Sequence, residues 1–185
     1  LVVDGSNIAT EGRTAPSLAQ LDAAVQSFIA QRGYEHVTVI VDGWHGDTSR
    51  MYPVGEISRR AERLIEVTYE CLMRGIAAVK AGVSTGKIGA VIQEFAEAER
   101  CSVVRDFCGH GVGRLFHDAP NILHYGSRGE GAPLKPGMIF TVEPMLNAGA
   151  PSVKVLNDGW TAVTKDKSLS AQYEHSVGVT EDGVV

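Results

Sequence analysis

The sequence has few cysteines and no long apolar run, and each absence excludes a class of protein. Its three cysteines, Cys71, Cys101 and Cys108, are odd in number and form no CxxC pair. That pattern excludes a disulfide-stapled scaffold and favours reduced thiols. No segment approaches the roughly 18 apolar residues of a membrane-spanning helix. We therefore predict a cytoplasmic protein that does not enter a membrane.

An excess of positive charge is also missing. The chain has 17 lysines and arginines against 22 aspartates and glutamates, a net charge of −5, so it lacks the basic surface that nucleic acid requires. In contrast, 44% of its 185 residues are hydrophobic, which is enough to bury one good core. The chain opens within an apolar strand pattern and without an initiator methionine. We expect it to be an excerpt of a longer protein.

Apolar periodicity in the first hundred residues predicts amphipathic helices and a β-hairpin. The hairpin is indicated by a β-branched run that ends at Asp42-Gly43 and returns through Asp47. The predicted elements are a strand over Leu1–Val3, a helix from Ser17 to Gly33, the hairpin over Val37–Tyr52, and helices from about Ile57 to Gly82 and from Ile88 to Arg100.

From Ser102 onward, glycine and proline are frequent, and β-branched runs alternate with turns. This pattern is typical of antiparallel strands. Because helices come first and antiparallel strands follow, we predict an α+β fold and not a doubly wound parallel one. The predicted strands are Met138–Glu143, Trp160–Thr164 and Ala171–Thr180, with a hairpin turn at Asn157–Gly159.

Four residues with carboxylate or imidazole groups occupy positions that suggest a metal site. His110 lies in the glycine-rich segment Asp106–Asp118, which we interpret as too flexible to be core. Asp47 follows a glycine, while Glu143 and Glu174 lie beside apolar strand residues, where burying a carboxylate without a cation is costly. Three carboxylates and one imidazole suit Mn²⁺, Fe²⁺, Co²⁺ or Zn²⁺. The pattern indicates metal-assisted hydrolysis.

These residues lie in four motifs that resemble those of the type I methionine aminopeptidases, which are metallopeptidases of the pita-bread fold. The resemblance runs from about Val37 to Val185, and the intervals between the motifs fit without adjustment. It implies an α+β pita-bread fold and the removal of N-terminal methionine from peptides or nascent proteins. The motifs are Gly46–Ser49, Gly109–Gly113 with Phe116–His117, Phe140–Pro144 and Ala171–His175.

The resemblance also implies a role for each candidate metal ligand. Asp47 and Glu174 would bridge two divalent ions, and His110 and Glu143 would hold one of these ions. Glu143 would in addition move a proton during hydrolysis. The metal would be cobalt, manganese, iron or zinc.

Three further residues are implied to contact the substrate. His117 would hydrogen-bond the scissile peptide group, while Phe116 and Trp160 would wall the methionine pocket. An ordinary structural role is open to each of the three as well. Phe116 and Trp160 fit ordinary core residues equally well, and His117 can be a surface imidazole.

Two departures from the family pattern affect these expectations. The family has a further metal-binding Asp eleven residues before the position of Asp47, where this chain has His36. Imidazole is a substitute ligand of different charge and shape, so we predict one tight metal site and a weakened second one. The family also has a preceding half, which the 36 residues before Val37 do not resemble. We therefore predict impaired activity and self-association through an exposed sheet edge.

A second resemblance covers Leu1–Asp42. The start of this segment is similar to the opening strand and turn of PIN-like (NYN) ribonucleases, in which an Asp and an Asn help to bind Mg²⁺ or Mn²⁺, and Asp4 and Asn7 match them. We therefore divide the chain into a PIN-like segment, residues 1–36, and a metallopeptidase-like domain, residues 37–185. Three alternatives to the peptidase stay open: a metal-dependent ribonuclease, a non-catalytic pita-bread binding module, and a chimera without a settled function.

Overall fold

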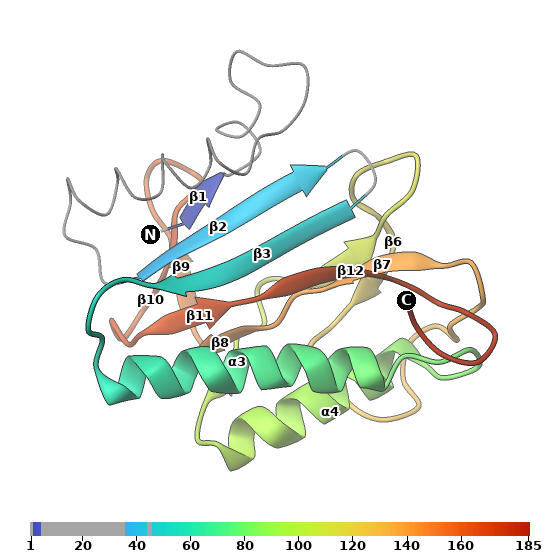
Figure 1. Ribbon diagram of the computed structural model, residues 1–185, viewed down its shortest axis with the longest axis horizontal. Coiled ribbons are helices and arrows are strands. Elements are labelled where there is room, and N and C mark those ends of the chain that lie inside the picture. The colour runs from blue at the N-terminus through green and yellow to red at the C-terminus, as the bar shows by residue number, and fades with distance from the viewer. Residues whose placement is uncertain (1, 5–35, 44–45) are drawn as a thin grey trace.

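The computed structural model describes residues 2–4, 36–43 and 46–185, with side chains from Thr48 onward. Within that part, a seven-stranded sheet forms one layer, with the strand order β1-β2-β3-β12-β7-β5-β6. Two helices, α3 (Arg59–Ala77) and α4 (Thr85–Ala98), pack against one face of the sheet (Figure 1). Helices on one face of a mostly antiparallel sheet form the α+β class that the sequence predicts.

The first three strands lie at one edge of the sheet. β2 (His36–Gly43) and β3 (Gly46–Pro53) form the predicted antiparallel hairpin, with Asp42 opposite Asp47. β1 (Val2–Asp4) pairs with β2 in parallel. The helix predicted from Ser17 to Gly33 falls outside the described residues.

The helix α3 follows from its N-cap and its apolar stripe. α3 begins after Ser58, whose Oγ accepts a hydrogen bond from the Ala61 N–H at 3.3 Å. The prediction that this helix reaches Gly82 was wrong, because it ends at Ala77. Gly82 adopts a φ of +82° and its N–H donates to the Leu134 carbonyl, so the chain there belongs to a loop. The buried residues of α3 are Ala61, Leu64, Val67, Thr68, Cys71, Leu72 and Gly75.

The strand predicted over Met138–Glu143 is confirmed and ends before Glu143-Pro144. The prediction of one continuous strand over Ala171–Thr180 was wrong, because the chain breaks at Tyr173 and passes from one sheet to another. Pro144 has no N–H to donate to a neighbouring strand, which gives the end of the first strand a chemical cause. The resulting strands are β7 (Ile139–Val142) and β12 (Glu174–Gly178) in the large sheet, and β8 (Met145–Asn147) and β11 (Ser170–Gln172), which pair with each other and with β4 (Ser102–Val103).

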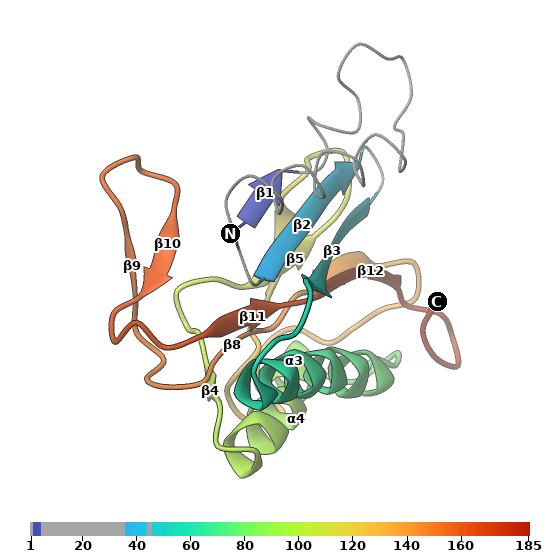
Figure 2. The ribbon, with the colours of Figure 1, turned by 60° about the vertical axis from the view of Figure 1, so that its left-hand side comes forward.

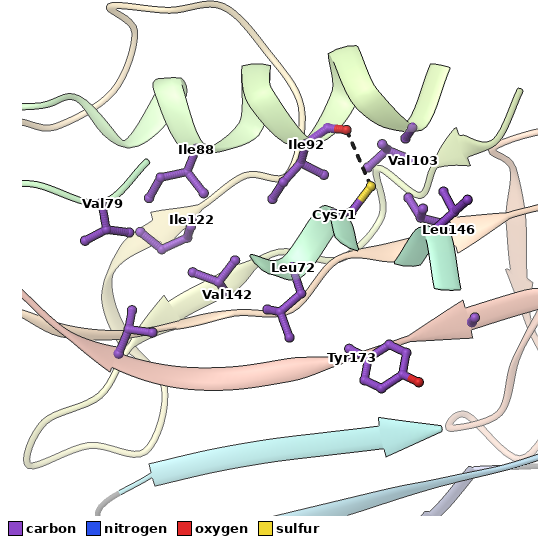
Figure 3. Close-up of a cluster of buried hydrophobic side chains, with 14 of the residues drawn as sticks. Cys71, Leu72, Val79, Ile88, Ile92, Val103, Ile122, Val142, Leu146 and Tyr173 are labelled. Carbon is purple, nitrogen blue, oxygen red and sulfur yellow. Dashed lines mark hydrogen bonds between the residues drawn. The ribbon is translucent and has the colours of Figure 1, made fainter. Parts of the chain in front are cut away.

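The hydrophobic core fills the space between the helices and the sheets (Figure 3). Leu72 of α3, Ile92 of α4 and Val142 of β7 are all 0% exposed. Gly75 lets α3 approach closely, because a Cβ at that position would lie only 2.7 Å from Ile92 Cδ1. The close packing of these elements gives the site above the core a rigid support.

Two further strand pairs complete the fold. β5 (Gly109–Gly111) and β6 (Asp118–Ile122) close the other edge of the large sheet. β9 (Val153–Val155) and β10 (Ala162–Thr164) form a separate hairpin that projects from the sheet (Figure 2), with the predicted turn at Asn157–Gly159. In the described part of the chain, neither helix is both long and apolar enough to span a membrane.

Candidate metal centre

Three of the predicted ligands converge where neighbouring strands of the large sheet begin or end. His110 lies in β5, Glu143 follows the last residue of β7, and Glu174 is the first residue of β12, and these strands are adjacent. One ligand atom from each residue lies within 4.8 Å of the other two. Glu174 is 2% and His110 7% exposed, so the cluster is largely shielded from water.

The glycines beside His110 are there for close packing. A Cβ on Gly111 would lie 2.1 Å from the Ala119 carbonyl oxygen, and one on Gly109 would lie 2.3 Å from the Thr141 carbonyl oxygen. Because both contacts are with backbone oxygens, neither neighbouring strand could make room for a Cβ without a shift of its backbone. The interpretation of this segment as too flexible for the core was therefore wrong, because Gly109–Gly111 is a fully buried strand.

The tautomer of His110 follows from its hydrogen bond. Nδ1 lies 3.0 Å from the Gly111 carbonyl oxygen, which can only accept, so Nδ1 carries the proton. In the neutral ring Nε2 then has no proton, and it lies 3.8 Å from Glu143 Oε1. In a metal-binding histidine, one ring nitrogen usually donates to a carbonyl, which fixes the tautomer, and the other nitrogen is left to bind the metal. Here Nδ1 and Nε2 have these two positions.

Two residues that were not identified as site residues from the sequence hold Glu143. The Oγ1 of Thr141 accepts a hydrogen bond from the His110 N–H at 3.0 Å and donates one to Glu143 Oε1 at 2.7 Å. The Nε2 of His124 accepts from the Glu143 N–H at 3.0 Å. Burial lowers the pKa of His124 from 6.5 to about 3, so its ring stays neutral. In the sequence, the burial of His124 was indicated by its position directly after the apolar pair Ile122-Leu123.

Of the predicted substrate residues, two lie beside the cluster. The ring of His117 is 4.3 Å from the ring of His110, centroid to centroid, and Phe116 contacts both histidines at 5.5 and 4.5 Å. His117 is exposed and Phe116 half-buried, so both face the open side of the cluster. Trp160 lies in the segment between β9 and β10 and is 79% exposed, which does not fit an ordinary core residue.

The remaining candidates are described by their backbone alone. Asp47 lies in β3, whose pairing with β12 sets Ser49 opposite Glu174. His36 is the first residue of β2 and Asp4 the last of β1. The side chains of these three residues, and the whole of Asn7, lie outside the described part of the chain.

The chemistry of the cluster fits a divalent cation. Two carboxylates and an imidazole lie together in a mostly buried place, where the carboxylates repel each other unless a cation neutralises them. Beside Glu174, the buried Oγ of Ser49 has no hydrogen-bond partner among the described residues. Burial, and then the charge of Glu143, raise the pKa of the Cys108 thiol, so it adds no thiolate ligand.

The chain is similar in sequence and fold to known proteins. The model of metallopeptidase family M24 matches residues 36–181. The methionine aminopeptidase of Rickettsia prowazekii (strain Madrid E) is 58% identical over 148 residues, which are 80% of this chain and 57% of that protein. The methionine aminopeptidase of Escherichia coli (strain K12) is 55% identical over 147 residues, 80% of this chain and 56% of that protein. The crystal structure of methionine aminopeptidase from R. prowazekii matches with a TM-score of 0.76 at 57% identity, covering 81% of this chain and 61% of that one.

These likenesses confirm the predicted resemblance and the pita-bread fold class. The chain spans little more than half the length of the curated relatives that it matches. The family match covers the two helices and the three strands that position the candidate metal ligands His110, Glu143 and Glu174. The chain therefore belongs to metallopeptidase family M24.

Proposed function

We propose that this chain removes N-terminal methionine from peptides or nascent proteins with the help of a divalent metal ion. The strongest support is the convergence of His110, Glu143 and Glu174 within 4.8 Å, with the His117 ring 4.3 Å from that of His110. The substrate class is supported by relatives named methionine aminopeptidase that are 55–60% identical to this chain.

The three clustered residues, together with Asp47, would hold the metal. We propose manganese, cobalt, iron or zinc, since a set of carboxylates and one imidazole suits these ions. When bound, such an ion lowers the pKa of a water molecule to about 7 and polarises a carbonyl. The proposal includes one tight site and a second, weaker position that depends on His36.

Glu143 is the group that we assign to proton transfer. Its side chain is 12% exposed, so it borders the open side of the cluster, and Thr141 donates a hydrogen bond to its Oε1. A carboxylate held in one orientation can accept a proton from the attacking water and deliver it to the leaving amine without rearranging.

His117 is assigned to the substrate. Its exposed imidazole can donate a hydrogen bond to the carbonyl of the scissile peptide, where negative charge develops. Phe116, in edge-on contact with His117, would form one wall of the methionine pocket. We propose Trp160 as a second wall.

The test is the release of methionine from Met-Ala-Ser by the purified chain. We expect slow turnover that is lost with a chelator and restored by Mn²⁺ or Co²⁺. His117→Ala should lower the rate by about 10²–10³ without changing the metal content, and His117→Gln, which keeps a donor, should recover part of the loss. A folded, metal-loaded chain that releases no methionine would contradict the proposal and favour a non-catalytic binding module.

A metal-dependent ribonuclease is the second candidate. The parallel pairing of β1 with β2 favours it, since Asp4 then ends a parallel strand as in PIN-like nucleases. Metal-dependent cleavage of single-stranded RNA that disappears in Asp4→Ala would establish it. The same result would support residues 1–36 as a separate PIN-like segment of a chimera.

Two further proposals concern the setting of the protein. We propose a cytoplasmic location, because Cys71, Cys101 and Cys108 are all free thiols. We also propose self-association through an edge of the large sheet. β6 is such an edge strand, and three of its five residues are exposed. Light scattering during size-exclusion chromatography should show a dimer or larger species, and a monomer at high concentration would contradict the proposal.

A further inference from the structure

We infer that His124 is a positioning residue that fixes the backbone of Glu143 and so sets the geometry of the metal cluster. The inference rests on the proposed function only in taking Glu143 as a metal ligand. His124 does not take part in the cluster itself, whose ligand atoms come from His110, Glu143 and Glu174.

The contact between the two residues is direct. His124 is 2% exposed, and its Nε2 accepts a hydrogen bond from the Glu143 N–H at 3.0 Å. Glu143 follows the last residue of β7 and precedes Pro144, at the break between two sheets. The N–H of Glu143 therefore donates to a side chain at the point where the strand ends. An imidazole that accepts through Nε2 must be neutral, with its proton on Nδ1.

The backbone around His124 is itself held by α4. A Cβ on Gly89 of α4 would lie 2.4 Å from the Tyr125 carbonyl oxygen and 2.6 Å from that of Leu123. The helix therefore packs directly against the backbone on both sides of His124. Just beyond, the Gly126 N–H donates to the side chain of Gln93 at 3.0 Å. The position of His124 is thus determined by a rigid helix and not by a free loop.

Glu143 is consequently fixed at two points. His124 holds its backbone, and Thr141 holds its carboxylate through a 2.7 Å hydrogen bond to Oε1. Because a metal site requires its ligands within a few tenths of an ångström of the right place, losing the first contact should let Glu143 shift. A purely structural role for His124 predicts lower stability alone. The positioning role predicts weaker and altered metal binding as well.

The experiment compares His124→Gln with His124→Leu in the full chain. Glutamine can present an oxygen to the Glu143 N–H, whereas leucine fills similar space without an acceptor. Co²⁺ alone is the probe, followed by calorimetry and by its visible absorption spectrum. We expect His124→Leu to bind Co²⁺ about 10–100-fold more weakly with a changed spectrum, and His124→Gln to recover affinity and spectrum. Val79→Ala, a buried change in the core, is the control and should lower the melting temperature without changing Co²⁺ affinity.

Two results would overturn the inference: a folded His124→Leu with wild-type Co²⁺ affinity and spectrum, or a His124→Gln as weak as His124→Leu. If the leucine variant does not fold, His124→Asn replaces it, because its shorter amide does not reach the N–H. The titration needs no turnover. Absence of methionine release from the wild-type chain would therefore refute the proposed function, while the cobalt data would still decide the role of His124.

Discussion

Thr141→Val removes one hydroxyl from a fully buried side chain and should weaken both the fold and metal binding. Thr141 is 0% exposed, and its Oγ1 accepts from the His110 N–H and donates to Glu143 Oε1, at 3.0 and 2.7 Å. Valine has almost the same shape as threonine. The substitution therefore deletes one hydrogen bond between β5 and β7 and one local hydrogen bond from Thr141 to Glu143, and it leaves the packing nearly unchanged.

The magnitude follows from what each partner loses. A buried N–H without an acceptor costs about 1–3 kcal/mol, and a hydrogen bond to a charged group contributes about 1.5–3 kcal/mol. The two losses share one hydroxyl, so they are not additive. We expect the free energy of unfolding at pH 7, without metal, to fall by about 2–4 kcal/mol. Without the bond that orients Glu143, Co²⁺ affinity should fall about 10–100-fold.

Urea denaturation in the presence of chelator measures the first effect, and Co²⁺ titration measures the second. Thr68→Val is the matched control. Thr68 is also 0% exposed, but its Oγ1 donates to the Leu64 carbonyl within α3, so its replacement should cost less than about 1 kcal/mol and leave Co²⁺ affinity unchanged. A Thr141→Val protein with the stability and Co²⁺ affinity of the wild type would refute the reasoning.

Three further outcomes are expected. His124 is neutral when folded, with its pKa lowered to about 3. Below pH 6.5 only the unfolded chain takes up a proton on His124, so at pH 4.5 the wild type should have lost about 3 kcal/mol more stability than His124→Gln in urea titrations. Gly111→Ala, whose Cβ would lie 2.1 Å from the Ala119 oxygen, should lower stability by about 1–3 kcal/mol, visible as a lower melting temperature. Glu174→Gln, which keeps the shape but removes the charge, should abolish tight Co²⁺ binding in calorimetry without lowering the melting temperature of the metal-free chain.

Local patterns were sufficient to predict the hairpin and the existence of both described helices. Asp42-Gly43 follows a β-branched run, and Ser58 precedes an apolar stripe of helical period, so each element is specified by neighbouring residues. The strand break at Tyr173 could not be predicted in this way. The strand predicted over Ala171–Thr180 continues through that position, and the change of sheet depends on the pairing of β8 with β11, segments far apart in the sequence.

The candidate site was predictable as far as its ligands lie in recognisable motifs. His110 and Glu174 lie in such motifs, and so do the supporting residues Thr141 and Gly111, but the sequence did not reveal what these two residues contact. Gly111 looked like a flexible position because its close neighbour, Ala119, is brought against it only by the pairing of β5 with β6. His124 carries no motif, and its partner is a backbone N–H nineteen residues away.

The central claim is that His110, Glu143 and Glu174 hold one divalent ion that supports peptide hydrolysis. Its most direct test is a titration of the metal-free chain with Mn²⁺ in which bound metal and methionine release from Met-Ala-Ser are measured in the same samples. We predict one tight site, a rate that rises with its occupancy, and the loss of both in Glu143→Gln. A rate that does not follow occupancy, or a Glu143→Gln protein that binds and hydrolyses like the wild type, would contradict the account.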